Sequence, residues 1–200
     1  LIHFDADIVG ISSLFSTQTE CAIDLANDIK SKLPDIPIVM GGNHASNLAS
    51  EILCQESSVD YIIAGEADYT FLEFLEKYFN KRNFLDVQGL VWREGSEIKM
   101  NPRPSFIANL DDLPFPAFDL YPMEEYFRIG MWHNIFTKSP RVAAIFTSRG
   151  CPQECVFCSV PDYLGYGFRS MSADKVIELV HWHVENYSVK ELQILDDNFT

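Results

Sequence analysis

Between residues 7 and 79 the sequence alternates short apolar runs with longer amphipathic stretches, and few folds accommodate such an alternation. The apolar runs have the length and content of strands in a parallel sheet, where both faces are covered. The stretches between them repeat their apolar residues at helical spacing. Strands are expected at 7–14, 36–40 and 59–65, and helices at 17–33, 48–55 and 68–79. This order predicts an α/β fold built on a Rossmann-like parallel sheet.

The alternation stops after this region. The next segment predicts a hairpin that turns at Glu94 and Gly95. Residues 101–122 are rich in proline and aromatic residues and too apolar for a free linker. We expect them to lie extended across a neighbouring surface.

A second strand–helix–strand pattern occupies the rest of the chain. It consists of a strand at 141–148, a helix capped by Ser172, and a strand at 191–197. The pattern predicts the beginning of another parallel α/β unit. The loop that follows its first strand lies where α/β folds place their chemistry.

Helical spacing also predicts which side chains face the core. On the helix at 68–79 the expected inward stripe consists of Phe71, Leu72, Leu75 and Phe79. Cys21 and Cys54 stand alone in amphipathic stretches, so both are expected to be small buried apolar residues rather than ligands.

Composition and charge narrow the class of protein. The hydrophobic content of 47% is ordinary for a globular protein, and the net charge of −14 argues against a nucleic-acid partner. No apolar run is long enough to cross a bilayer, and no secretory leader opens the chain. We expect a cytoplasmic protein with a small-molecule substrate and no membrane or nucleic-acid partner. The sequence lacks an initiator Met and ends directly after a strand, so it is interpreted as a segment of a longer protein.

Three cysteines, Cys151, Cys155 and Cys158, lie on one loop at positions i, i+4 and i+7. Such clustering favours a metal or cluster site over a disulfide framework. Structural zinc takes four ligands, and a fourth could come from His181 or His183, which lie on a predicted helix more than twenty residues away. An iron–sulfur cluster held by three thiolates would keep one iron open for chemistry. Both kinds of site stay open at this point.

The C-x3-C-x2-C spacing, with Phe157 before the last cysteine, resembles the signature of the radical S-adenosylmethionine superfamily. The resemblance implies that the three cysteines hold a [4Fe–4S] cluster whose open iron binds S-adenosylmethionine. It implies that Phe157 packs near the adenine, and that Asp196 or Asp197 contacts the methionyl amino group. The chain has Asp-Asp where the family often has Gly-Gly-Glu. An external electron donor such as flavodoxin or ferredoxin is also implied.

The front half resembles the cobalamin-binding domain of B12-dependent radical S-adenosylmethionine enzymes. Ser12-x-Leu14 and Gly41-Gly42 match two parts of the corrinoid pattern, with 26 residues between them. The third part, D-x-H-x-x-G, would precede residue 1. The glycines would let a flat macrocycle or its nucleotide tail approach the backbone, and Ser12 could hydrogen-bond the tail. His44 is interpreted as a loop-end histidine.

These observations predict a cobalamin-binding-like Rossmann domain at 1–80, a hairpin and extended connector at 81–140, and the start of a partial TIM-like radical S-adenosylmethionine barrel at 141–200. The resemblance implies methyl transfer to an unactivated carbon or to phosphorus, with a [4Fe–4S] cluster, S-adenosylmethionine and cobalamin as cofactors. Cyclisation or rearrangement on the same scaffold, a methylthiotransferase, and a zinc- or corrinoid-binding module without catalysis are the alternatives.

Overall fold

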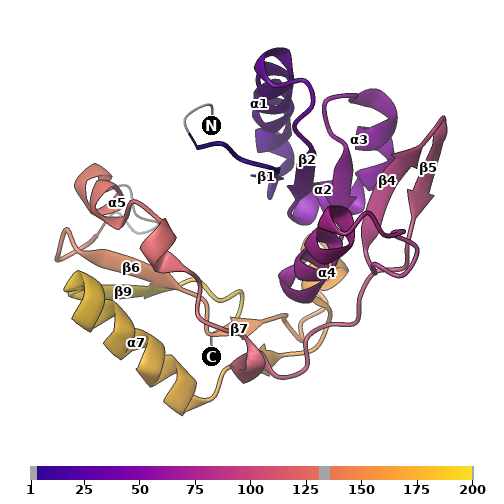
Figure 1. The fold of residues 1–200 in the computed structure, drawn as a ribbon. Coiled ribbons are helices and arrows are strands. Elements are labelled where there is room, and N and C mark those ends of the chain that lie inside the picture. Colours follow the sequence, from indigo (N-terminus) through magenta and orange to yellow (C-terminus); the bar gives the residue numbers. More distant parts are fainter. Residues whose placement is uncertain (1–3, 131–135, 200) are drawn as a thin grey trace. The chain divides into compact units, whose positions relative to one another are not determined.

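The computed structural model describes residues 4–130 and 136–199. The chain divides into two compact units; the first extends to Phe106 and the second begins at Ile107. In the described residues, the first unit is built on a five-stranded sheet, and the second contains two smaller sheets (Figure 1). No helix in these ranges is both long enough and apolar enough to cross a membrane.

The first sheet has the strand order β1-β2-β3-β4-β5. Its strands are β1 (Val9–Ser12), β2 (Ile38–Gly41), β3 (Tyr61–Ile63), β4 (Leu90–Glu94) and β5 (Glu97–Met100). The first three are parallel, as the sequence predicts, and β4 and β5 form the expected hairpin. This hairpin pairs antiparallel with β3, so the first sheet continues past residue 80, where the predicted first domain ends. The three-part division of the chain into domains stays a prediction.

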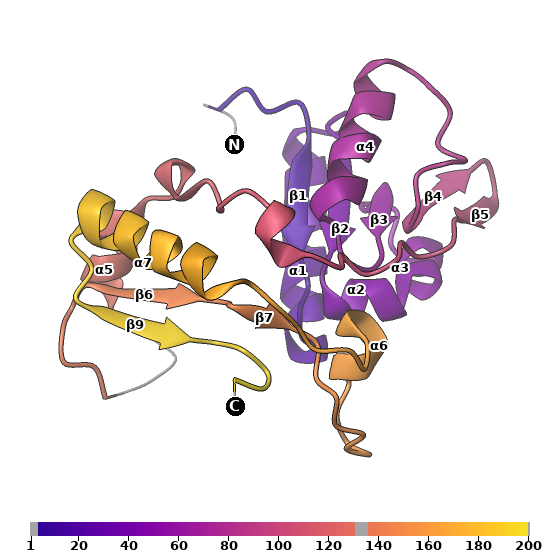
Figure 2. The same ribbon diagram turned by 90° about the horizontal axis from the view of Figure 1, so that it is seen from below.

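Helices cover both faces of this sheet (Figure 2). One face carries α1 (Thr19–Lys32), α2 (Asn43–Asn47) and α3 (Ala49–Gln55), and the other carries α4 (Asp68–Phe79). Successive strand residues point to opposite faces, as a pleated strand requires. On β2, for example, Ile38 and Met40 join the first core and Val39 joins the second. The short helix α2 forms where the sequence indicates only a turn.

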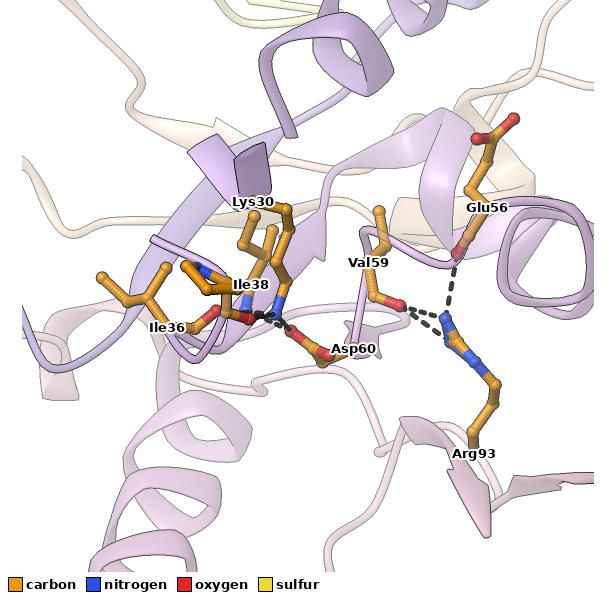
Figure 3. A network of polar contacts seen from close by, with 8 residues as sticks. Lys30, Ile36, Ile38, Glu56, Val59, Asp60 and Arg93 are labelled. Carbon is orange, nitrogen blue, oxygen red and sulfur yellow. Dashed lines mark hydrogen bonds and ion pairs between the residues drawn. The ribbon is translucent and has the colours of Figure 1, made fainter. Parts of the chain in front are cut away.

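A polar network ties the amino-terminal ends of the parallel strands to their neighbours (Figure 3). Lys30 Nζ donates to Ile36 O at 2.7 Å and forms an ion pair with Asp60 at 2.7 Å. The Asp60 carboxylate also accepts from Ile38 N at 2.8 Å. From β4, the Arg93 guanidinium donates to the carbonyl oxygens of Val59 and Glu56 at 2.6–2.9 Å. The network fixes the loops at the sheet edge opposite Ser12 and Gly41.

Two expectations about helix faces are wrong. On α4 the buried residues are Thr70 and Phe74; of the expected stripe, Leu75 packs against the second core as predicted, while Leu72 and Phe79 are more than half exposed. Phe74 fits among the rings of Tyr61, Tyr78 and Phe84, with centroids 5.0–5.7 Å away, and this rotates the helix relative to the expected stripe. The two cysteines expected to be buried, Cys21 and Cys54, are exposed because alanines and larger aliphatic residues occupy the inward positions of α1 and α3.

The second unit is built around the parallel pair β6 (Val142–Ile145) and β9 (Glu191–Ile194), joined through α7 (Ala173–Tyr187). This is the predicted βαβ unit (Figure 1). A smaller antiparallel ladder joins β7 (Ser148–Arg149) to β8 (Arg169–Ser170). The remaining elements are η2 (Leu110–Asp112), η3 (Phe118–Leu120), α5 (Met123–Ile129) and α6 (Val160–Leu164). Ser172 caps α7 as predicted, because its Oγ accepts from Lys175 N at 3.2 Å.

Candidate cofactor sites

The carboxyl ends of the parallel strands of the first unit form the first candidate site. Ser12 and Gly41 are register partners across β1 and β2, so the structure brings two parts of the predicted corrinoid motif side by side. Leu14 and Phe15 follow β1 at the same edge and are more than half exposed. Exposed apolar side chains beside an exposed hydroxyl and bare glycine backbone suit a flat, mostly apolar ligand with polar substituents.

Gly41 and Gly42, predicted to share one role, differ in what surrounds them. Gly42 has φ +97°, and a Cβ added to it would lie 2.6 Å from the carbonyl oxygen of Ser13. A side chain is therefore excluded at Gly42 by the protein's own backbone. Within 4 Å, the described part of the chain offers a Cβ on Gly41 a single neighbour, Ile63 O at 3.8 Å. Gly41 leaves room at this edge for an outside group.

A hydrogen bond that the motif did not predict crosses this edge. Ser16 Oγ lies 2.9 Å from His44 Nδ1, and His44 N donates to Ser13 O at 3.1 Å. Ser46 Oγ joins the neighbouring turns, donating to Gly42 O at 2.8 Å and accepting from Gly65 N at 3.1 Å. These contacts make the edge a connected set of loops. Their signal in the sequence is limited to the serines after β1 and the stretch Asn43–Asn47 after β2.

The second candidate site is the cysteine loop, residues 150–168, which the β7–β8 ladder closes at its base. Cys151 and Cys158 are partly buried and Cys155 is exposed, and all three are free thiols. Cys158 N donates to Cys155 O at 3.0 Å, which turns the chain between them. Within 4–130 and 136–199, however, no three Cys, His, Asp or Glu side chains converge closely enough to hold a metal ion. The loop brings the three thiols into one short segment.

The donor chemistry of this loop fits a cluster better than a structural zinc ion. Three unpaired thiols in eight residues are the ligand set of a three-thiolate iron–sulfur site. Zinc would need a fourth ligand. His183 is fully buried, and its ring packs edge-on against Phe118 at 4.5 Å. Burial lowers the pKa of His183. His183 therefore serves the apolar packing of α7 in this structure.

The base of the loop depends on the glycine before the first cysteine. Gly150 has φ +82°, and a Cβ there would overlap the carbonyl oxygen of Gly167 and approach Leu164 O at 3.0 Å. Arg169 adds two hydrogen bonds at the base, to Leu164 O at 3.0 Å and to Ile107 O at 2.8 Å. The loop is anchored by close backbone contact. Phe157, by contrast, is 89% exposed, so nothing in the described chain covers the residue predicted to pack near the adenine.

The two aspartates at the end of β9 have different surroundings. Asp196 accepts hydrogen bonds from Thr147 and Ser148. Asp197 is exposed, and its pKa is raised by partial burial and by the charge of Asp196. The pKa of the Tyr163 phenol, on α6, is raised mainly by burial. The nearby charges of Asp197 and Cys158 raise it further. The motif pointed to both aspartates but not to Thr147, Ser148 or Tyr163.

Comparison with known proteins gives matches along nearly the whole chain. A family model described as B12 binding domain matches residues 1–75. Cytidylyl-2-hydroxyethylphosphonate methyltransferase of Streptomyces wedmorensis is 32% identical over 219 residues, covering 99% of this chain and 41% of that protein. Hopanoid C-3 methylase of Methylococcus capsulatus is 33% identical, covering 86% of this chain and 31% of that protein. The chain thus spans less than half the length of these relatives.

Solved structures share the fold. The cobalamin-dependent S-adenosylmethionine radical enzyme OxsB, with aqua-cobalamin and S-adenosylmethionine bound, aligns with a TM-score of 0.77 at 21% identity, covering 100% of this chain and 26% of that one. The radical S-adenosylmethionine methyltransferase TsrM of Kitasatospora setae aligns with a TM-score of 0.72 at 16% identity, covering 98% of this chain and 38% of that one. These alignments support the α/β, Rossmann-like assignment.

Proposed function

This chain belongs to the family of radical S-adenosylmethionine enzymes that contain a cobalamin-binding domain, and from this premise we propose that the full-length protein is a cobalamin-dependent methyltransferase. The observation that carries the proposal is the order of two candidate sites along one chain. The sheet edge with Ser12 and Gly41 comes first, in the first unit, and the three-cysteine loop follows β6 in the second unit. The names of the curated relatives, both methylating enzymes, support it.

We assign the cobalamin contacts to the carboxyl edge of the first sheet. Ser12 supplies an exposed hydroxyl, Gly41 supplies open backbone, and Leu14 supplies apolar surface. Gly42 acts indirectly, because it lets the turn after β2 lie against Ser13. The residues of this edge bind and orient the cofactor, whose own chemistry performs the methyl transfer.

We assign the cluster ligands to Cys151, Cys155 and Cys158. When bound, a three-thiolate [4Fe–4S] cluster supplies an open iron and an electron for S-adenosylmethionine. The chain's own part is to hold the three sulfurs on one anchored loop, with Gly150 and the β7–β8 ladder fixing its base. We propose that Phe157, which is exposed on the same loop, packs near the adenine, and that an external flavodoxin or ferredoxin is the electron source.

The substrate is proposed to be a small molecule methylated at an unactivated carbon or at phosphorus. The two relatives named above are a phosphonate methyltransferase and a hopanoid methylase by name, and they are about equally similar to this chain. The region that this chain shares with both relatives thus occurs in enzymes named for chemically unrelated substrates. We propose that substrate selection belongs to other parts of the full-length protein.

Anaerobic reconstitution of the full-length protein tests the assignment. We expect about four irons, four sulfides and one cobalamin per chain. Replacement of any loop cysteine by alanine should abolish iron loading and leave cobalamin binding intact. Cys54→Ala is the matched control, because this exposed cysteine lies on α3 in the first unit. Iron without cobalamin would refute the corrinoid assignment, and one zinc without iron would refute the cluster.

A further inference from the structure

Beyond the last backbone hydrogen bond between the paired strands β9 and β6, from Leu195 N to Ile145 O at 2.9 Å, the Asp196 carboxylate bonds to the segment that follows β6. Its Oδ1 accepts from Thr147 N at 2.6 Å. Its Oδ2 accepts from Thr147 Oγ1 at 2.5 Å and from Ser148 Oγ at 2.8 Å. A carboxylate offers about four lone-pair sites, so the protein itself uses most of the hydrogen-bonding capacity of Asp196.

The neighbouring carboxylate is in the opposite situation. Asp197 is exposed, and no hydrogen bond or ion pair to it is formed by the part of the chain that the structure describes. Its acceptor sites are therefore available to an outside cation. Asp196 and Asp197, adjacent in sequence, differ in what they can still bind.

The residues that Asp196 holds lead directly into the cysteine loop. Ser148 begins β7, and Cys151 follows it after Arg149 and Gly150. On the other side, Met171 N donates to Thr147 O at 2.8 Å where β8 leaves the loop. Asp196 thus fixes the strand end from which the loop starts. A shift of this strand end would move Gly150. The backbone of Gly150 lies so close to the carbonyl groups of Gly167 and Leu164 that no side chain fits there.

We propose that the two aspartates have separate roles, in which Asp196 is a positioning residue that sets the base of the cysteine loop and Asp197 alone contacts the methionyl ammonium of S-adenosylmethionine. The assignment rests on the proposed function. It separates two residues that the sequence motif treats as equivalent candidates, and it makes Thr147 and Ser148 part of the support for the cluster.

Alanine and asparagine variants separate a geometric role from a charged one. Asp196→Ala removes all three hydrogen bonds. Asp196→Asn keeps an oxygen for Thr147 N, and its amide can donate to the two hydroxyls, which accept as well as donate. A positioning role therefore predicts poor iron loading for Asp196→Ala and near-normal loading for Asp196→Asn. If Asp196 instead contacted the methionyl ammonium group directly, both variants should lose binding of S-adenosylmethionine to the same extent, because both lose the negative charge.

The measurements are made on the full-length, anaerobically reconstituted protein. Iron and sulfide are quantified, and binding of S-adenosylmethionine is measured by equilibrium dialysis and by its effect on the electron paramagnetic resonance spectrum of the reduced cluster. Asp197→Asn should load iron normally and bind S-adenosylmethionine about tenfold or more weakly. Glu178→Gln, an exposed carboxylate-to-amide change on α7, is the matched control and should change neither quantity.

Each outcome decides the assignment. Normal iron loading in Asp196→Ala, or loss of S-adenosylmethionine binding in Asp196→Asn equal to that in Asp197→Asn, overturns it. If Asp196→Ala does not fold, the double variant Thr147→Val/Ser148→Ala removes two of the three hydrogen bonds from the other side, and normal loading in that variant overturns the inference. Absence of a cluster in the unmodified protein is the separate failure of the proposed function.

Discussion

Replacing Gly42 by alanine is expected to destabilise the first unit before any cofactor is considered. The residue has φ +97°, and the added Cβ would lie 2.6 Å from Ser13 O and 2.8 Å from Ser13 C. Both atoms belong to backbone that is itself fixed, since Ser13 N donates to Gly41 O at 2.8 Å and Ser13 O accepts from His44 N. The turn cannot relieve the overlap by rotating a side chain.

The magnitude follows from two contributions. With φ +97° and ψ 172°, Gly42 adopts an extended backbone conformation that is essentially restricted to glycine and costs another residue roughly 1–3 kcal/mol. Overpacking against a fixed structure adds about 1–3 kcal/mol. The sum, roughly 2–6 kcal/mol, is a large share of the stability of a domain of this size. At about 4–8 °C per kcal/mol, the unfolding transition of this unit should fall by at least about 8 °C.

Scanning calorimetry of the full-length protein without added cobalamin measures the shift. Gly41→Ala is the control, because its Cβ meets only Ile63 O at 3.8 Å and the residue has no positive φ. We expect Gly41→Ala to unfold like the unmodified protein but to bind aquacobalamin about tenfold or more weakly, since the methyl group fills the space proposed for the cofactor. Absorbance titration measures the binding.

The two variants refute different parts of the reasoning. An unchanged transition in Gly42→Ala would mean that the close approach to Ser13 does not constrain this turn. Unchanged cobalamin affinity in Gly41→Ala would mean that the cofactor does not approach the backbone there, whatever holds it elsewhere.

Two further predictions concern stability away from the cofactors. The pKa of His183 is lowered by burial, so the unfolded state binds the proton more readily; stability should be complete above about pH 6.5 and fall below it by up to about 1.4 kcal/mol per pH unit. His183→Leu should make stability less dependent on pH, which thermal unfolding at pH 7.5 and 5.5 would measure. An equal loss of stability between these pH values in both proteins would contradict the role given to His183. Arg93→Ala leaves the carbonyl groups of Val59 and Glu56 without their guanidinium donor and should cost about 2–4 kcal/mol in urea unfolding, with iron loading unchanged. Arg93→Lys should recover only part of the loss, because an ammonium group lacks the fork that spans both carbonyls.

Elements set by local pattern were predictable from the sequence. The three parallel strands, the helix at 68–79 and the hairpin follow from apolar periodicity and turn chemistry, and the structure confirms each of them, with the turn at Gly95 and Ser96, one residue later than predicted. The attachment of that hairpin to β3 was not predicted. It depends on pairing between Tyr61 and Trp92, residues far apart in the chain, and periodicity carries no information about such partners.

The candidate sites were predictable to a similar depth. Motif spacing located the cysteine loop and predicted that Ser12 lies near Gly41. Both predictions succeed because these residues directly follow or end predicted strands, whose positions the sequence indicates. Spacing could not distinguish Gly41 from Gly42, since φ and the distance to Ser13 are set by tertiary structure. Nor could it tell an aspartate that is bonded by the protein from one that is available to a ligand.

The errors on the helices have the same physical origin. Along α4 apolar residues occur on nearly every side, so periodicity permits more than one inward stripe. The structure selects the one containing Phe74, because a ring at that position meets Tyr61 of β3 and Phe84 of the following loop. Leu72 and Phe79 are then left exposed by the choice of stripe rather than by any polarity of their own. Sequence patterns therefore identify an amphipathic helix more securely than its buried face, and a residue's role becomes assignable only when its partners on other strands are known.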